Sequence, residues 1–328
     1  MNAISEQQTP KSELVIQSNA ISRGIYTCST MARKVIAYCI LKVNHYPENI
    51  GHNDIDVIHH FKSTFPISEF INKLGISKGS NTYKQVKRAV EELSTSVIQV
   101  ENTDEKYKAY TWFSSATYDK SKDLIELEFN QQIGLAVMQW REIKQFSAMN
   151  IKTIGEIQSF YALRYFEIAS SWYNTKGRYG NEKNTWKFKL SVDEIKTMFK
   201  IDKDAYKDRM NNFITKVVKN PVKELNNVNT NFQMSYAKLV ENHKTLGFEF
   251  TCVQSDSIKI DASDSPEDKV EKTQINEELM DIEYYKTKYA DRWDEAISNS
   301  KLQNDLPFDF DVLTEYRAVE YLKAQGLD

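Results

Sequence analysis

Basic, amide and hydroxyl side chains gather on one face of a helix that the sequence predicts over residues 204–226. At about 100° per residue, the larger apolar side chains fall on one arc: Tyr206, Met210, Phe213, Ile214 and Val217. The opposite arc carries Ala205, Asp208, Arg209, Asn212, Thr215, Lys216 and Lys219. Arginine can bond guanine bidentately, asparagine can bond adenine, and threonine offers a methyl and a hydroxyl group. This face predicts a helix that reads the edges of DNA bases.

A second helix, predicted over residues 77–96, has the same distribution of side chains. Its apolar arc consists of Tyr83, Val86, Val90 and Leu93, and Glu91 and Glu92 confine its acidic charge to the second half. The first half would therefore face DNA. With the flanking lysines, the predicted DNA-binding residues of both helices are Lys78, Asn81, Lys84, Gln85, Arg88, Lys203, Lys207, Arg209, Asn212, Thr215, Lys216 and Lys219. For either helix alone, the alternative is a polar face that only contacts solvent. The recurrence of the same polar face in both helices favours DNA binding.

The elements that position these faces follow one order twice, helix, polar-faced helix and β-hairpin, over residues 65–129 and 189–253. Pro66 begins the first helix, where its missing N–H costs nothing, and Gly75 ends it. The other expected elements are a strand or turn and then a helix over 14–43, strands at 55–61, 97–100, 107–113, 123–129, 231–236 and 247–253, helical sequence over 131–158, an amphipathic helix over 160–173, and a helix over 189–199. The repeated order predicts an α+β protein with two tandem winged helices.

The charge of the chain is divided unevenly. The net charge is −3, yet residues 255–328 hold 9 Lys and Arg against 19 Asp and Glu, so the rest of the chain carries +7. A basic body suits a nucleic-acid partner. The acidic extension begins with a linker predicted to be disordered and continues with short helical patterns at 276–289, 291–301 and 312–324. It is either a solubilising appendage or a docking segment, and its large apolar residues favour docking.

Other features favour a cytoplasmic protein. No run approaches the ~18–20 apolar residues of a membrane span, so no membrane partner is expected. The first residues lack the pattern of a secretory signal. Cys28, Cys39 and Cys252 form no CxxC pair, and reduced, buried thiols are expected.

Enzymatic signatures are weak in this sequence. His45, His52, His59 and His60 lie near Asp54 and Asp56, but no HxxxH or HxxEH spacing relates them, so a solvated loop is favoured over a metal site. The chain has no GxxxxGK[ST] loop for a nucleotide and no GxSxG or HExxH motif. We therefore expect no catalytic site, no metal and no cofactor. Stacking on melted bases is one interpretation of five aromatic residues, and core packing is favoured over it: Trp112, Phe113, Trp172, Tyr173 and Trp186.

Two segments resemble a known family. Residues 162–169 (ALRYFEIA) are similar to the motif that opens the second domain of plasmid replication initiator (Rep) proteins of theta-replicating, iteron-containing plasmids. A second family pattern is matched in order by Tyr206, Phe213, Val217, Val218, Pro221, Val222, Glu224, Leu225 and Asn226. The opening residues 12–21 also resemble the family's start, and coverage runs from about residue 12 to 253. Arg164 and Glu167 fit the first motif, and we expect them to form a partly buried ion pair rather than to contact DNA.

The resemblance implies three parts: an N-terminal winged helix over 1–150 for dimerisation and DNA contact, a C-terminal winged helix over 151–254 as the main DNA reader, and the acidic extension over 255–328. It also implies binding of a monomer to direct repeats at a plasmid origin, self-association, repression of the protein's own gene, and recruitment of the host initiator and replicative helicase. A transcriptional regulator without an initiator role is the alternative, and a strand-nicking initiator nuclease is a more distant one.

Overall fold

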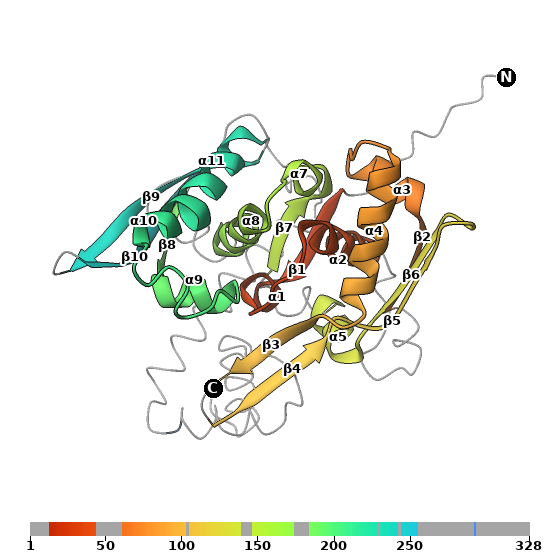
Figure 1. The fold of residues 1–328 in the computed structure, drawn as a ribbon, viewed down its shortest axis with the longest axis horizontal. Helices are drawn as coiled ribbons and strands as arrows, with labels where there is room; N and C mark the ends of the chain where they lie inside the picture. Colours follow the sequence, from red (N-terminus) through yellow and green to blue (C-terminus); the bar gives the residue numbers. More distant parts are fainter. Residues whose placement is uncertain are drawn as a thin grey trace.

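The computed structural model describes residues 13–43, 61–102, 105–138, 146–173, 184–228, 230–241 and 244–254, and Arg292. The four clustered histidines, all but Phe61 of the strand expected at 55–61, and the acidic extension apart from Arg292 lie outside these residues. The described chain forms two α+β units side by side, with a helix between them (Figure 1).

The N-terminal segment forms the predicted strand and helix, β1 (Leu14–Ser18) and α2 (Thr30–Val43), and a short helix between them that was not predicted, α1 (Asn19–Arg23). β1 pairs antiparallel with β7 (Phe146–Asn150), which lies inside the segment predicted to be helical throughout. That prediction is right for α5 (Gln131–Met138) and α7 (Ile151–Glu156) and wrong for β7. Burial alternates along β7, and this period of two is the signature of a strand.

The first winged helix is built from β2 (Lys62–Pro66), α3 (Ile67–Lys73), α4 (Ser80–Leu93), β5 (Phe113–Asp119) and β6 (Leu124–Phe129). The strands form an antiparallel sheet in the order β2-β6-β5. Pro66 and Gly75 flank α3 as predicted. Gly75 has a φ of 66°, and the Ile76 N–H donates to the carbonyl of Ile71, which ends the helix.

A separate hairpin follows α4 and extends away from the body, formed by β3 (Val97–Asn102) and β4 (Tyr107–Thr111) (Figure 1). The single strand predicted over 107–113 is wrong, because the chain leaves one sheet at Trp112 and enters the other. Trp112 is fully buried, and its ring meets that of Tyr26 edge to face. A buried side chain at the corner therefore divides one expected strand into two.

The second winged helix contains a three-stranded sheet in the order β8-β10-β9, with bounds Thr185–Ser191, Lys244–Gln254 and Phe232–Glu241. β9 and β10 confirm the predicted wing and are longer than expected. β8 corrects the prediction of a helix from residue 189, since the helix α9 (Val192–Met198) begins only after Ser191. Ser191 and Glu194 form a reciprocal capping box that fixes this start.

The long helix predicted over 204–226 begins later than expected. Residues 203–208 are a turn, and Tyr206 has a φ of 65°. Three consecutive segments then form one helical rod: α10 (Met210–Phe213), the π-helical η3 (Ile214–Lys219) and α11 (Asn220–Asn227). We call this rod helix 210–227.

The central helix α8 (Phe160–Trp172) was predicted to be amphipathic, and it is instead buried on all sides from Ala162 to Ser171. One side packs on α1 and β7, and the other packs on the second winged helix. There the Tyr165 ring contacts the rings of Phe199 and Phe250. The two units therefore share one continuous hydrophobic core through α8.

The aromatic residues considered for base stacking pack within this core or against it. Trp112, Phe113 and Trp186 are buried, and Trp186 Nε1 donates to the carbonyl of Ala169 over 3.0 Å. Trp172 stacks on Phe188, and Tyr173 meets Trp186 edge to face. The three cysteines are free and buried, as predicted.

Candidate nucleic-acid interface

The polar face of α4 is exposed as the sequence predicts. Its buried side consists of Val86, Ala89, Val90 and Leu93, against the rest of the first unit. The five predicted contact residues are all exposed: Lys78, Asn81, Lys84, Gln85 and Arg88. Lys78 precedes the helix, whereas the other four lie along it. The first half of α4 therefore presents amide and basic groups to solvent, and their contact with DNA stays a prediction.

The predicted residues of the second unit are exposed but divide between two elements. Asn212, Thr215, Lys216 and Lys219 lie on helix 210–227. The prediction that Lys207 and Arg209 also lie on this helix is wrong. Lys203 and Lys207 belong to the turn at 203–208, and Arg209 is the residue between the turn and the helix.

An open hollow of about 450 Å³ lies where this turn meets the helix. Arg209, Asn212 and Lys216 line it, together with two aspartates, and the exposed Lys207 lies 3.7 Å from one of them, Asp204. The turn and the helix therefore form a single mixed-charge surface.

A proline explains the π-helical segment in the middle of the rod. Pro221 has no N–H to donate to the carbonyl of Val217, and a proline ring crowds the carbonyl four residues before it. The wider turn of η3 comes immediately before this position. Burial repeats in pairs, so Phe213 and Ile214 are buried, Thr215 and Lys216 exposed, and Val217 and Val218 buried again. The exposed face therefore continues through the irregular turn.

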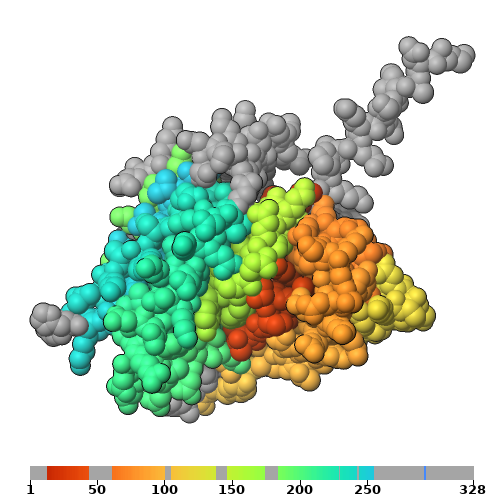
Figure 2. Space-filling model, turned by 45° about the horizontal axis from the view of Figure 1, so that its top comes forward, coloured from red at the N-terminus to blue at the C-terminus, as the bar shows by residue number. Residues whose placement is uncertain are grey.

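Both candidate reading helices lie on the same face of the molecule. Figure 2 shows the α4 region in orange and the second unit's helices in teal, with the segment that contains α7 in yellow-green and the N-terminal segment in red between them. The same order of elements appears in the ribbon view (Figure 1). A single duplex lying along this face would pass both helices.

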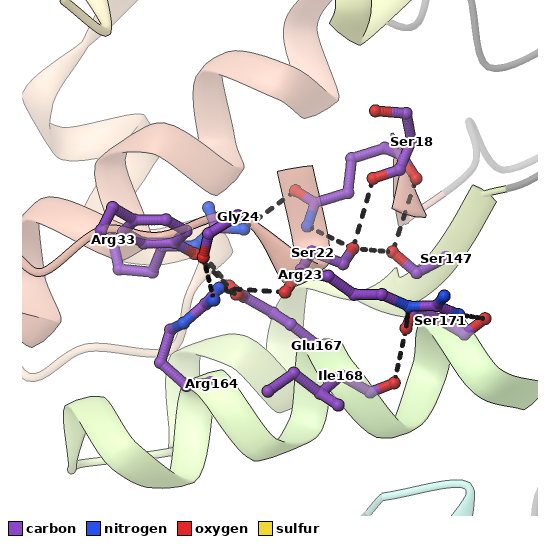
Figure 3. A network of polar contacts seen from close by, with 12 residues as sticks. Ser18, Ser22, Arg23, Gly24, Arg33, Ser147, Arg164, Glu167, Ile168 and Ser171 are labelled. Atoms are coloured by element: carbon purple, nitrogen blue, oxygen red, sulfur yellow. Dashed lines mark hydrogen bonds and ion pairs between the residues drawn. The ribbon is translucent and has the colours of Figure 1, made fainter. Parts of the chain in front are cut away.

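A buried polar network holds α8 to the N-terminal segment, and Figure 3 shows it at close range. The Glu167 carboxylate is 2% exposed and accepts hydrogen bonds from Arg33, Arg164 and the Tyr26 hydroxyl. Arg164 also donates to the carbonyls of Ser22 and Gly24 over 3.1 and 2.7 Å. The expected Arg164–Glu167 ion pair is confirmed, and it is fully rather than partly buried.

Arg33 completes this network from α2. Burial disfavours its charged form, but the Glu167 carboxylate outweighs that effect and holds the pKa of Arg33 above its ordinary value. The Arg33 guanidinium also donates to Gln17 Oε1 over 2.9 Å. At the other end of α8, Arg23 donates to Ser171 Oγ over 2.9 Å and lies over the Trp172 ring. Polar contacts thus fix α8 along its whole length.

Two further contacts fix the surface between the candidate reading helices. Lys34 Nζ donates to the carbonyl of Gly155 over 2.7 Å, which joins α2 to α7, and burial lowers the pKa of Lys34 to about 8. A side chain at Gly155 would overlap the carbonyl of Leu74, so α7 approaches the end of α3 closely. These contacts fix α7 against α2 and the end of α3, and α2 in turn packs on α4.

Neither a metal site nor a membrane span is found within the described ranges. They contain no group of three or more His, Cys, Asp or Glu side chains arranged to hold a metal ion. No helix in the same ranges is long and apolar enough to cross a membrane.

Two family models match this chain. The model described as Initiator Replication protein, WH1, matches residues 14–170, and the model described as Initiator Rep protein, WH2, matches residues 191–252. The chain belongs to the plasmid replication initiator (Rep) family. No curated protein matches the sequence of this Rep initiator.

Similarity to a solved structure supports the fold. The Rep initiator is similar to the Pi initiator protein in complex with iteron DNA, with a TM-score of 0.58 and 16% identity over 76% of this chain and 100% of that chain. RctB domains 2–3 match with a TM-score of 0.38 and 8% identity, over 73% of this chain and 98% of that chain. The MSBI1.176 WH1 domain, isolated from a multiple sclerosis patient, matches with a TM-score of 0.22 and 18% identity, over 33% and 76%. The first match supports two tandem winged helices.

Two residues of the family pattern make hydrogen bonds that join helix 210–227 to other elements of this Rep initiator. Glu224 Oε1 accepts from the backbone N–H groups of Gln158 and Ser159 over 2.6 and 2.9 Å, at the start of α8. The Asn226 amide exchanges two hydrogen bonds of 2.8 Å with the backbone of Met234. The pattern therefore ties helix 210–227 to α8 and to β9, and it marks no base contact by itself.

Proposed function

We propose that this Rep initiator binds duplex DNA sequence-specifically at direct repeats of a plasmid origin and starts replication there. The observation that carries the proposal is that two winged helices present exposed basic and amide faces on the same side of the molecule. The Pi initiator, which shares the fold, was solved in complex with iteron DNA.

Helix 210–227 reads one major groove and α4 reads the groove of the adjacent turn. Asn212, Arg209 and Arg88 have the side chains that best discriminate base edges. The flanking lysines, Lys78, Lys203 and Lys219, hold phosphates, which positions the protein without selecting a sequence. Both helices therefore contribute to one extended site.

The first experiment is selection of duplexes from a random library by the full chain at moderate salt. The expected product is an asymmetric sequence spanning about two helical turns and bound by one protein monomer. Enrichment of no sequence would contradict specific reading and leave only electrostatic attraction.

Variants then test the assigned contacts on the selected duplex. Asn212→Ala and Arg209→Ala are expected to weaken binding by about 1–3 kcal/mol each and to relax one base position. Lys219→Ala is expected to weaken all duplexes alike and to lower the salt dependence. If both substitutions leave the binding isotherm unchanged, helix 210–227 is not the reader.

Replication distinguishes the initiator from a transcriptional regulator. A plasmid that carries the selected repeats and the gene for this chain should replicate, and Asn212→Ala should reduce its copy number. We also propose repression of the protein's own gene from an inverted repeat, tested with a promoter reporter. Stable promoter repression with no plasmid replication would favour the regulator.

Family membership supports the proposals for the first two domains and for the partners, and the large apolar residues of the acidic extension support docking. We propose that residues 1–150 mediate self-association and DNA contact, residues 151–254 are the main reader, and residues 255–328 dock a partner. The proposed partners are a second copy, the host replication initiator and the replicative helicase, in the bacterial cytoplasm. We expect no catalytic activity, and a covalent tyrosine–DNA product on incubation with supercoiled origin DNA would contradict this.

A further inference from the structure

We propose that the surface between the two reading helices is a phosphate-binding strip, formed by Thr30, Gln158, Asn220 and Lys223, on which the DNA backbone lies. None of these residues belongs to either polar face predicted from the sequence. The inference rests on the proposed function, because it assumes one duplex in contact with both helices.

Two neighbouring hollows form the strip. The first, of about 470 Å³, lies between α2 and α4, and Thr30, Gln85, Arg88 and Gln158 are among its lining residues. The second, of about 440 Å³, is lined by residues that include Gln158, Asn220 and Lys223. Gln158 lines both hollows, so the depression is continuous from α4 to α11. In Figure 2 this surface lies between the orange and teal helices.

Three carboxylates line the two hollows: Glu156, which is exposed, and Glu92 and Glu224, which accept hydrogen bonds from the protein backbone. Glu92 Oε1 accepts from the Ser29 N–H over 2.7 Å, and Glu224 accepts from two N–H groups at the start of α8. Among the described residues, the exposed Arg88 and Lys223 form no ion pair. Apart from Glu156, the polar side chains assigned to the strip are a cation, amides and a hydroxyl, and Gln158 Nε2 already donates to the carbonyl of Glu156 over 2.7 Å.

These groups match the chemistry of a phosphodiester. A duplex whose successive major grooves face two helices must carry its backbone across the surface between them. Lysine, glutamine, asparagine and threonine side chains are common donors to phosphate oxygens. Because α2, α7, α8 and α11 are joined by the Lys34 and Glu224 contacts, the strip is held at a fixed position between the readers. The strip would therefore set the register of the duplex without reading its sequence.

The test uses the full chain and the duplex selected by the wild type, titrated over a range of salt concentrations. Lys223→Gln should weaken binding to the selected duplex and to a base-substituted duplex by the same factor. It should also reduce the slope of log K against log salt by about 0.9, the value for one lost phosphate contact. Gln158→Lys should tighten binding and increase the slope by about 0.9. Both positions are exposed, so neither change disturbs the core.

Lys187→Gln is the matched control. Lys187 is exposed on β8 and alternates with Trp186 and Phe188, which face the core, so it lies on the far side of the sheet from helix 210–227. Its substitution should leave the slope unchanged. If Lys223→Gln and Gln158→Lys behave like this control while Asn212→Ala weakens binding, the strip is wrong and the proposed function stands. A change in base preference in Lys223→Gln would also overturn the strip, and failure of the wild type to bind any duplex would overturn both proposals.

Discussion

Replacing Glu167 by glutamine removes the only carboxylate of the buried network while keeping its shape. Glu167 faces Arg33 and Arg164, and all three side chains are at most 3% exposed. One nitrogen of each guanidinium, Nη1 of Arg33 and Nε of Arg164, has no hydrogen-bond partner among the described residues. Neutral glutamine therefore leaves two buried cations without a counter-charge.

The expected loss in the free energy of unfolding is about 3–5 kcal/mol, the cost of breaking a buried ion pair by removing one partner. For a folded unit of this size, about 2–4 °C per kcal/mol predicts a fall in Tm of about 6–20 °C. Such a loss is a large part of the ~5–15 kcal/mol that stabilises most proteins. Urea unfolding followed by circular dichroism measures it directly.

A triple variant separates lost pairing from lost shape. Arg33→Met, Arg164→Met and Glu167→Leu together remove every charge of the cluster, and such replacements are often neutral or stabilising. Here the carbonyls of Ser22 and Gly24 lose their Arg164 donors, so we expect stability between that of Glu167→Gln and the wild type. Ordinary substitutions lower the free energy of unfolding by about 1 kcal/mol. If Glu167→Gln lowers it by no more than about this amount, the pairing argument is refuted.

Three further substitutions test other parts of the structure. Gly155→Ala should cost about 1–3 kcal/mol in the free energy of unfolding, because its methyl group would overlap a backbone carbonyl. Gly79→Ala has open space and affects only the N-cap of α4, so it should cost less in the same urea assay. Glu224→Gln should cost about 0.5–2 kcal/mol by weakening the cap of α8, and Glu241→Gln at the exposed end of β9 is its control; equal costs would contradict the cap. Burial raises the pKa of the Cys28 thiol from 9.0 to about 12, so the folded state keeps a proton that the unfolded state loses, and the resulting stabilisation, complete below pH 9, is lost as pH rises to about 12. Between pH 9 and about 12, the free energy of unfolding of Cys28→Ala should therefore fall less steeply than that of the wild type, by about 1.4 kcal/mol per pH unit. Parallel pH profiles of the variant and the wild type would exclude Cys28 as the cause.

Local periodicity was sufficient to predict the polar face of α4. Its apolar residues recur at helical spacing over the whole element, and Gly75 and Pro66 mark the bounds of the helix before it. The same reasoning began helix 210–227 too early, because residues 204–209 have helical composition but fold as a turn with Tyr206 in the left-handed region. A helical projection of the sequence cannot detect such a conformation, because it assumes in advance that the residues form a helix.

Non-local pairing accounts for the other errors. β7 is short and pairs with β1, which lies far away in the sequence, so its strand character depends on a partner that periodicity does not identify. The Arg164–Glu167 pair was predicted from the family motif, whereas Arg33 and Tyr26 join it from the N-terminal segment. The strip was invisible for the same reason, because Gln158 and Lys223 come from separate segments.

The burial of α8 on all sides restricts how initiators of this type can exchange parts. A recombinant gene that joined the first winged helix of one initiator to the second of another would have to match two packing surfaces of a single helix at once. Tyr165 would need its aromatic partners on one side, and Glu167 would need Arg33 of α2 on the other. New origin specificity is therefore more readily acquired by substitutions on the exposed faces than by exchange of whole winged-helix units between plasmids.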